Sequence, residues 1–216
     1  MKTDAQLKKD VESELEWDPA INAAHVGVMV ENGVVTLTGH LHTYSEKALV
    51  EHAVQHVQGV KALAVELDVK LDPSHKRSDT EIAAAAEDAL TWNAQVPAGI
   101  GLKVEQGWLT LKGDVEWEYQ RRAAVRAVRS LTGVVGVSNN IMLKQRPAHS
   151  NVAAKIRDAL VRQAEKDAQH IDVVIDGTEA KLRGTVHSWA ERAAAQGAAW
   201  SAVGITSVVN ELKVSS

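Results

Sequence analysis

The chain of 216 residues repeats one pattern of about 70 residues three times. In each copy, two strand-like segments flank a turn, and a helix-like segment then leads to a third strand. Two glycine landmarks recur, one in the second strand and one before the third, and each set is spaced by 74 and 71 residues. The glycines are Gly39, Gly113 and Gly184 in the second strand, and Gly59, Gly133 and Gly204 before the third. This spacing predicts three tandem domains over residues 1–72, 78–145 and 149–216.

Each copy is predicted to fold as helix, strand, strand, helix, strand. The first helix carries apolar residues at helical spacing, as in Leu7, Val11 and Leu15. A second helix is expected at about 45–57, 119–131 and 190–203. Because a helix connects the second strand to the third, those two strands should be parallel. The sequence therefore predicts an α+β protein of three αββαβ units, each a three-stranded mixed sheet with two helices on one face.

Tight turns join the first two strands. Asn32-Gly33 between alternating apolar runs is a strong two-residue hairpin signal, because both turn positions need positive φ. Gln106-Gly107 occupies the same place in the second unit. In the third unit Asp176-Gly177 moves the glycine one residue earlier, which predicts a different or longer turn there.

The second strand alternates apolar and polar residues, as in Val35, Leu37 and Leu41 against Thr36, Thr38 and His40. This period of two predicts a sheet that is covered on one face only. The second-strand glycines fall on the covered side, where we expect a helix backbone to approach closely or the strand to bend. The glycines before the third strand are predicted to be left-handed C-terminal caps of the second helices.

Two features of the first helices invite specific predictions. Asp4 and Asp79 are the expected N-caps. Trp17 and Trp92 occupy matching places at the ends of these helices, and matched position favours a buried lid over each core, the alternative being an exposed interface. Arg162 stands at that place in the third unit.

The net charge of −4 argues against general nucleic-acid binding. The charge is uneven, with net values of −6 for residues 1–74, +2 for 75–148 and 0 for 149–216, so only the middle unit is basic. The sequence has neither a secretory signal nor a transmembrane segment. A soluble, cytoplasmic protein is therefore expected from the chain as given, or a periplasmic one if the chain is a mature form.

A basic row on the second helix of the middle unit is the main candidate site. Arg122, Arg126 and Arg129 are spaced i, i+4 and i+7 and so share one face, with Arg121 beside them and Trp117 just before the helix. A cationic amphipathic helix with a nearby indole fits contact with anionic lipid headgroups or a protein partner. The simpler interpretation is a solvated helix face, balanced by Glu116 and Glu118.

Histidines give a weaker metal signal. His40 and His42 point to one side of a strand, and His52 and His56 are one helical turn apart. No thiolate is present and this set does not recur in the other units, so no metal or other cofactor is predicted. The chain also lacks a nucleophile motif, a phosphate-binding loop and a carboxylate pair in a cleft, so it is not expected to be an enzyme.

The ordered pattern V-x-V-x-x-G-x-V-x-L-x-G, then a helix, then G-V-x-x-V-x-N-x-L, resembles the BON domain of bacterial osmotically inducible and nodulation proteins. It is clearest from Ile100 to Leu143. The resemblance implies an αββαβ fold and a non-enzymatic role, usually binding phospholipid surfaces or supporting the cell envelope under osmotic stress. One alternative is a cytosolic protein-interaction module that forms homo-oligomers. Another is potassium or other ion sensing, since some cytosolic BON proteins are associated with potassium binding.

Overall fold

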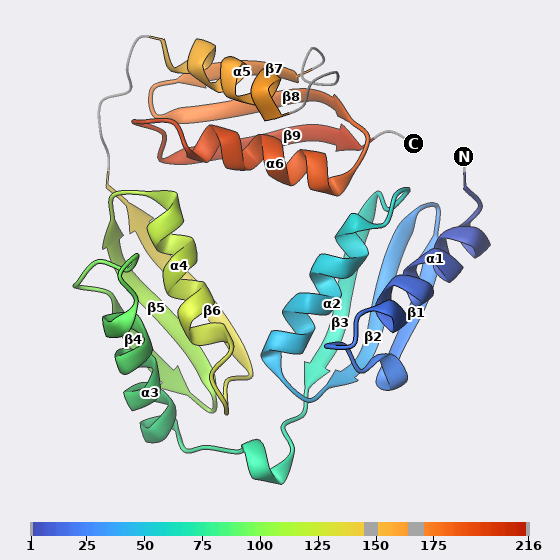
Figure 1. Cartoon of the computed structure of the whole chain (residues 1–216), viewed down its shortest axis with the longest axis vertical. Coiled ribbons are helices and arrows are strands. Elements are labelled where there is room, and N and C mark those ends of the chain that lie inside the picture. The colour runs from blue at the N-terminus through green and yellow to red at the C-terminus, as the bar shows by residue number, and fades with distance from the viewer. Residues whose placement is uncertain (1, 145–150, 164–170, 215–216) are drawn as a thin grey trace.

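The computed structural model describes residues 2–144, 151–163 and 171–214, and it shows three separate units in chain order (Figure 1). The first unit contains α1 (Asp4–Trp17), β1 (Val26–Glu31), β2 (Val34–Leu41), α2 (Tyr44–His56) and β3 (Ala62–Val69), with a short 3-10 turn η1 (Ala23–His25) before β1. The second contains α3 (Asp79–Trp92), β4 (Gly101–Glu105), β5 (Trp108–Val115), α4 (Glu118–Arg129) and β6 (Gly136–Leu143). The third contains α5 (Val152–Gln163), β7 (Ile171–Asp176), β8 (Glu179–Val186), α6 (Trp189–Trp200) and β9 (Ser207–Val214). A second 3-10 turn, η2 (Pro73–His75), joins the first two units.

Each unit builds one three-stranded mixed sheet. The strand orders are β1-β2-β3, β4-β5-β6 and β7-β8-β9. The first pair of each sheet is antiparallel and the second pair is parallel, as a helical connection requires. The predicted α+β class and αββαβ order are confirmed.

Both helices of a unit pack on the same face of its sheet, where the core lies. The inward residues of the second strands are buried, as the alternation predicts: Val35, Leu37, Leu41, Leu109, Leu111, Val115, Ala180, Leu182 and Val186. Thr36, Thr38 and His40, on the other face of β2, are only partly buried. Each sheet is therefore covered on one side, and its other side is open.

The hairpin turns have two residues in all three units. Asn32 and Gly33 have φ of 54° and 81°, and Gln106 and Gly107 have 52° and 77°, so both turn positions are left-handed as expected. In the third unit only Gly177, at the first turn position, has positive φ, of 59°. This turn has the same length as the other two but differs in type, because a glycine at the first position suits a type II′ hairpin.

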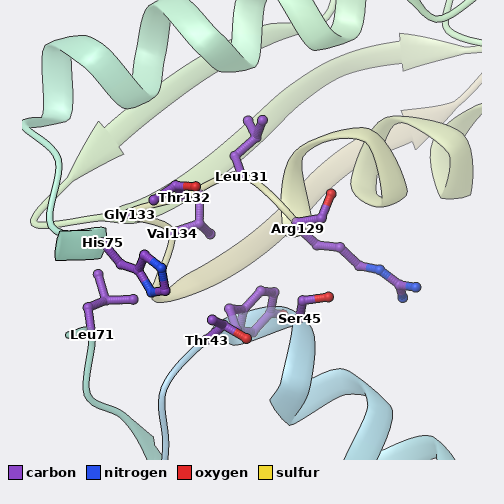
Figure 2. Close-up of a pocket in the computed structure, with 11 residues that line it drawn as sticks. Thr43, Ser45, Leu71, His75, Arg129, Leu131, Thr132, Gly133 and Val134 are labelled. Carbon is purple, nitrogen blue, oxygen red and sulfur yellow. The ribbon is translucent and has the colours of Figure 1, made fainter. Parts of the chain in front are cut away.

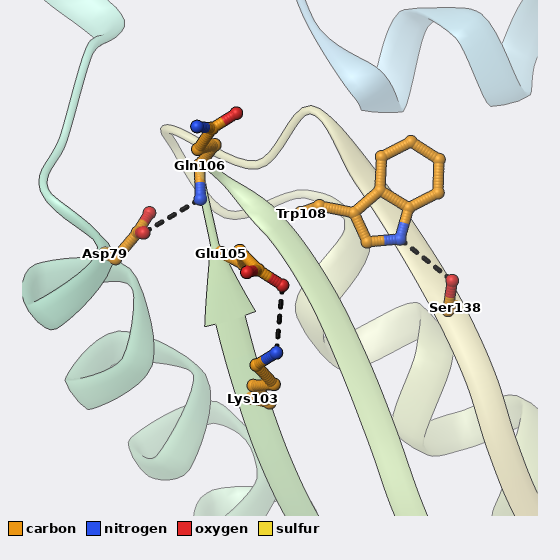
Figure 3. A network of polar contacts seen from close by, with 6 residues as sticks. All are labelled: Asp79, Lys103, Glu105, Gln106, Trp108 and Ser138. Carbon is orange, nitrogen blue, oxygen red and sulfur yellow. Dashed lines mark hydrogen bonds and ion pairs between the residues drawn. The ribbon is translucent and has the colours of Figure 1, made fainter.

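Asp4 and Asp79 are not the N-caps; the caps are Thr3 and Ser78, each one residue earlier. Both aspartates instead hold the hairpin turn of their unit. The carboxylate of Asp79 accepts a hydrogen bond from the backbone N–H of Gln106 at 2.8 Å (Figure 3). It accepts a second from the backbone N–H of Gly107, also at 2.8 Å. Asp4 does the same for Asn32 and Gly33 at 2.7 and 3.0 Å. These bonds tie the first helix to the hairpin across about 28 residues of chain.

All the repeated glycines have positive φ, which was predicted only for the set before the third strands, and the reasons differ from those expected. Gly39 has φ of 119°, and a Cβ there would overlap the carbonyl oxygen of His25, just before β1. The close approach therefore comes from the 3-10 segment η1 and not from the α-helices that pack on the sheet. Gly59, Gly133 and Gly204 have φ between 90° and 104°, yet the helices end three to four residues earlier, so these glycines shape the loop into the third strand and do not cap the helices.

The prediction that Trp17 and Trp92 are buried lids is wrong. Trp17 is 84% exposed and Trp92 is 88% exposed. The buried residues of these helices end with Leu15 and Leu90, and each tryptophan follows by two positions. Two residues correspond to about 200° of helical rotation, so the indoles point away from the core.

The three units are arranged in a triangle with α2, α4 and α6 on its inner side (Figure 1). These helices follow one another head to tail, since the start of each lies near the end of another. The start of α2 lies by the end of α4, the start of α4 by the end of α6, and the start of α6 by the end of α2. The second helices therefore form the joints of a closed ring.

Replacing Gly39 by Ala should destabilise the first unit by about 3 kcal/mol, because the new Cβ would meet a backbone carbonyl at a φ that costs roughly 1–3 kcal/mol by itself. Chemical denaturation would measure this. Gly197→Ala is the matched control, since Gly197 lies inside α6 with no atom within 4 Å of an added Cβ. That change should stabilise the protein by about 0.5–1 kcal/mol. Equal effects of the two substitutions would contradict this account of Gly39.

Candidate functional site

The basic row on α4 is partly exposed and partly enclosed. Arg122 and Arg126 are exposed, whereas Arg121 and Arg129 are half-buried. Arg126 donates a hydrogen bond to Gln95 at 3.4 Å. Within the described part of the chain, neither Arg122 nor Arg129 has an ion-pair or hydrogen-bond partner. Their cationic groups are available to an anion, because no carboxylate of the described ranges pairs with them.

Arg121 differs from the residues at the same repeat position in the other units. Lys47 in the first unit and Arg192 in the third donate hydrogen bonds to their own edge strands, at the carbonyls of Leu67 and Leu212. Arg121 instead pairs with the buried Glu118 at 2.6 Å and stacks over the ring of Trp200, 5.0 Å from its centroid. The cationic side chain at this position thus contacts the neighbouring third unit through a cation–π interaction, and not its own sheet.

The joint between the second and third units forms an aromatic and charged pocket. It is lined by Trp117, Glu118, Tyr119, Arg122, Trp200 and Ser201. Tyr119 is 48% exposed, so part of this lining remains open to solvent. Indole and phenol rings beside an unpaired guanidinium offer both an apolar surface and a positive charge.

The joint between the first and second units contains a second pocket, with Arg129 at its edge (Figure 2). Tyr44, the first residue of α2, packs against the core of the second unit. The loop after α4 lines the other side with Leu131, Gly133 and Val134. Burial, aided by the nearby Glu51, raises the pKa of Tyr44.

The joint between the first and third units is made by Trp189, the first residue of α6. Its indole packs against the core of the first unit and donates a hydrogen bond to the carbonyl of Val60 at 2.8 Å. The guanidinium of Arg192 lies over the same indole, 5.0 Å from its centroid. This contact joins residues 129 positions apart.

The open sheet face of the second unit carries two large exposed apolar side chains. Trp108 is 49% exposed and Met142 is 65% exposed. The Trp108 indole lies over Gly136 and donates a hydrogen bond to Ser138 at 2.8 Å (Figure 3). Its orientation is therefore fixed by the sheet.

The candidate histidines form two small groups. His40 stacks on His25 with ring centroids 4.7 Å apart, and His42 lies 6.0 Å from His40. His52 and His56 are 4.2 Å apart on α2. Among the described residues, no three His, Cys, Asp or Glu side chains are arranged to hold a metal ion. Likewise, no helix in the described ranges is long and apolar enough to cross a bilayer.

The BON domain family model matches residues 3–70, 78–145 and 149–216, nearly the whole chain. The chain belongs to the BON domain family. It is also similar to Osmotically-inducible protein Y of Escherichia coli (strain K12), with 27% identity over 144 residues that cover 62% of this chain and 72% of that protein.

Two matches to solved structures have lower sequence identity and low TM-scores. One is CdsD, described as a structural protein of the type III secretion system of Chlamydia trachomatis; the match has 17% identity, covers 94% of this chain and 90% of that one, and has a TM-score of 0.26. Its C-terminal domain matches with 17% identity and a TM-score of 0.27, covering both chains fully.

The sequence analysis identified the arginines but did not identify Tyr44 and Trp200 as joint residues. The start of the second helix nevertheless carries a signal. Tyr44 and Trp189 stand five residues after the second-strand glycine of their units, at the solvent-prone start of a helix. An aromatic residue at the first position of this helix does not pack in the core of its own unit, so its presence in two of three copies indicates a contact with another unit.

Loss of His40 should reduce the acid sensitivity of the first unit. Desolvation, and then the nearby Lys70, His25 and His42, lower the pKa of His40 from its ordinary 6.5. The unfolded chain then binds more protons than the folded one as pH falls through 6.5, so folding stability declines over that window. His40→Gln should narrow the difference in Tm between about pH 7.5 and about pH 5.5.

The control is His75→Gln, which removes one imidazole outside the stacked cluster. The pH dependence of Tm should narrow more in His40→Gln than in this control. An unchanged pH dependence in His40→Gln would contradict the assignment.

Proposed function

We propose that this chain is a non-enzymatic, stress-associated bacterial binding protein that contacts anionic phospholipid surfaces through the basic face of α4. The contact residues are Arg122 and Arg126, assisted by Arg121, Arg129 and Trp117. The observation that carries the proposal is a pair of exposed guanidiniums without carboxylate partners in the described residues, beside the partly open aromatic pocket at Tyr119 and Trp200.

Two further observations support this proposal. The second unit is the only basic one in an otherwise acidic or neutral chain, so an anionic surface would be drawn to it. BON membership and the similarity to an osmotically inducible protein support a role in bacterial stress. We further propose that the protein acts in the cytoplasm and contacts the anionic lipids of the cell envelope from the cytoplasmic side.

Vesicle flotation tests the proposal. Phosphatidylcholine vesicles with rising phosphatidylglycerol content should float the protein at low salt and release it at high salt. The double substitution Arg122→Glu and Arg126→Glu should weaken the partition constant at least roughly 30-fold. Loss of two basic residues removes about 1 kcal/mol each near an anionic membrane, and the two added carboxylates are repelled by it.

The matched control reverses two exposed lysines on α1, Lys8→Glu and Lys9→Glu, and so changes the net charge equally. The control should bind vesicles much as the unsubstituted chain does. If both double variants lose binding to the same extent, net charge and not the α4 face is responsible, and the proposed site is wrong.

A second candidate function is self-association through the open sheet faces, favoured by Trp108 and Met142 on the second sheet. Met142 belongs to β6, which is an edge strand with one side unpaired in its sheet. Light scattering over rising concentration should then show a dimer that Met142→Lys disrupts and Met29→Lys, on the first sheet, does not. A strict monomer at every concentration would exclude this function.

A further inference from the structure

The three joints of the ring use one position of the repeat. The first residue of each second helix meets the end of another unit's second helix or the loop that follows it: Tyr44 meets the second unit, Glu118 lies at the third, and Trp189 meets the first. This is a head-to-tail association inside one chain, and it closes because three copies complete the turn.

The joints differ in how the chain supports them. The first and second units are neighbours in sequence, as are the second and third, so short linkers hold those pairs together. The first and third units are joined only by folding, through the Trp189 indole, its hydrogen bond to Val60 and the contact of α2 with α6. Trp189 is therefore the residue on which closure of the ring depends.

Closure also determines how much of the α4 basic face is accessible. In the closed ring α4 lies on the inner side, Arg129 borders the joint with the first unit, and Arg121 is stacked on Trp200 of the third. Only Arg122 and Arg126 remain exposed. A flat anionic surface meets a second helix poorly when that helix faces the centre of a ring.

We propose that Trp189 is a latch that holds the ring closed and limits access to the α4 face, so that opening the joint between the first and third units strengthens binding to anionic surfaces. This inference rests on the proposed function, because the shielded site is the one proposed above. With the ring open, the first and third units are no longer held by each other, and each can move away from α4 about its linker. Such movement would open the two joints that border Arg129 and that stack Arg121 on Trp200.

Two measurements on the full chain test the latch. Trp189→Ala should increase the radius of gyration in small-angle X-ray scattering. It should also raise the partition constant for vesicles that contain phosphatidylglycerol by about fivefold for each arginine released. Trp189→Phe keeps an apolar ring but loses the N–H donor. Its radius of gyration and its partition constant should lie between those of the unsubstituted chain and of Trp189→Ala. Circular dichroism confirms that each variant is folded.

The matched control is Trp92→Ala, which removes the same side chain from an 88% exposed site on α3 and should change neither measurement. An unchanged radius of gyration in folded Trp189→Ala would overturn the latch. A larger radius of gyration without stronger vesicle binding would overturn the proposal that the closed ring shields the α4 face. In that case, loss of vesicle binding on charge reversal at Arg122 and Arg126 would still support the proposed function. Absence of vesicle binding in every variant would refute both.

Discussion

Each unit buries only one face of its sheet, and the rest of the structure depends on this constraint. A parallel pair such as β2 and β3 needs a helical crossover, and the first helix packs beside that crossover helix on the same side. A domain of about 70 residues has too little chain to cover the second face as well. The outer sheet faces therefore stay polar or open, and the ends of the second helices are left for contacts with other units.

The joints supply apolar contacts that a small one-sided core cannot. Tyr44 and Trp189 each start a helix of one unit, yet each side chain packs against the core of another unit. Large aromatic side chains suit this role because they bury much surface with few rotatable bonds. The second unit has Glu118 at that position, and its joint depends on the stacking of Arg121 on Trp200. The most polar joint therefore lies beside the exposed arginines.

Local features of the fold could be predicted because they depend on neighbours in sequence. Asn32-Gly33 specifies its turn through backbone conformation alone, and the alternation in β2 identifies the covered face. Where the prediction failed, a small shift in position mattered. Trp17 lies two residues past Leu15 and so points outwards, and Asp4 lies one residue past its cap and so reaches the hairpin turn. Matched positions in two units showed that these residues share a role, without showing which one.

The site could be predicted only in part, since its arginines follow a helical period but their surroundings come from other units. Nothing in the spacing of Arg121 or Arg129 indicates contact with the third or first unit. Contacts between units depend on how whole domains dock, and the helical period of α4 carries no information about docking. What the repeat does offer is comparison at equivalent positions. Lys47, Arg121 and Arg192 share one position, and two of them bond to their own sheet while the third reaches a neighbour. Since the cores are alike in all three units, divergence at such helix-start positions makes the joints between the units different. In a repeat protein of this kind, functional differences should be sought there before they are sought in the shared glycines and strands.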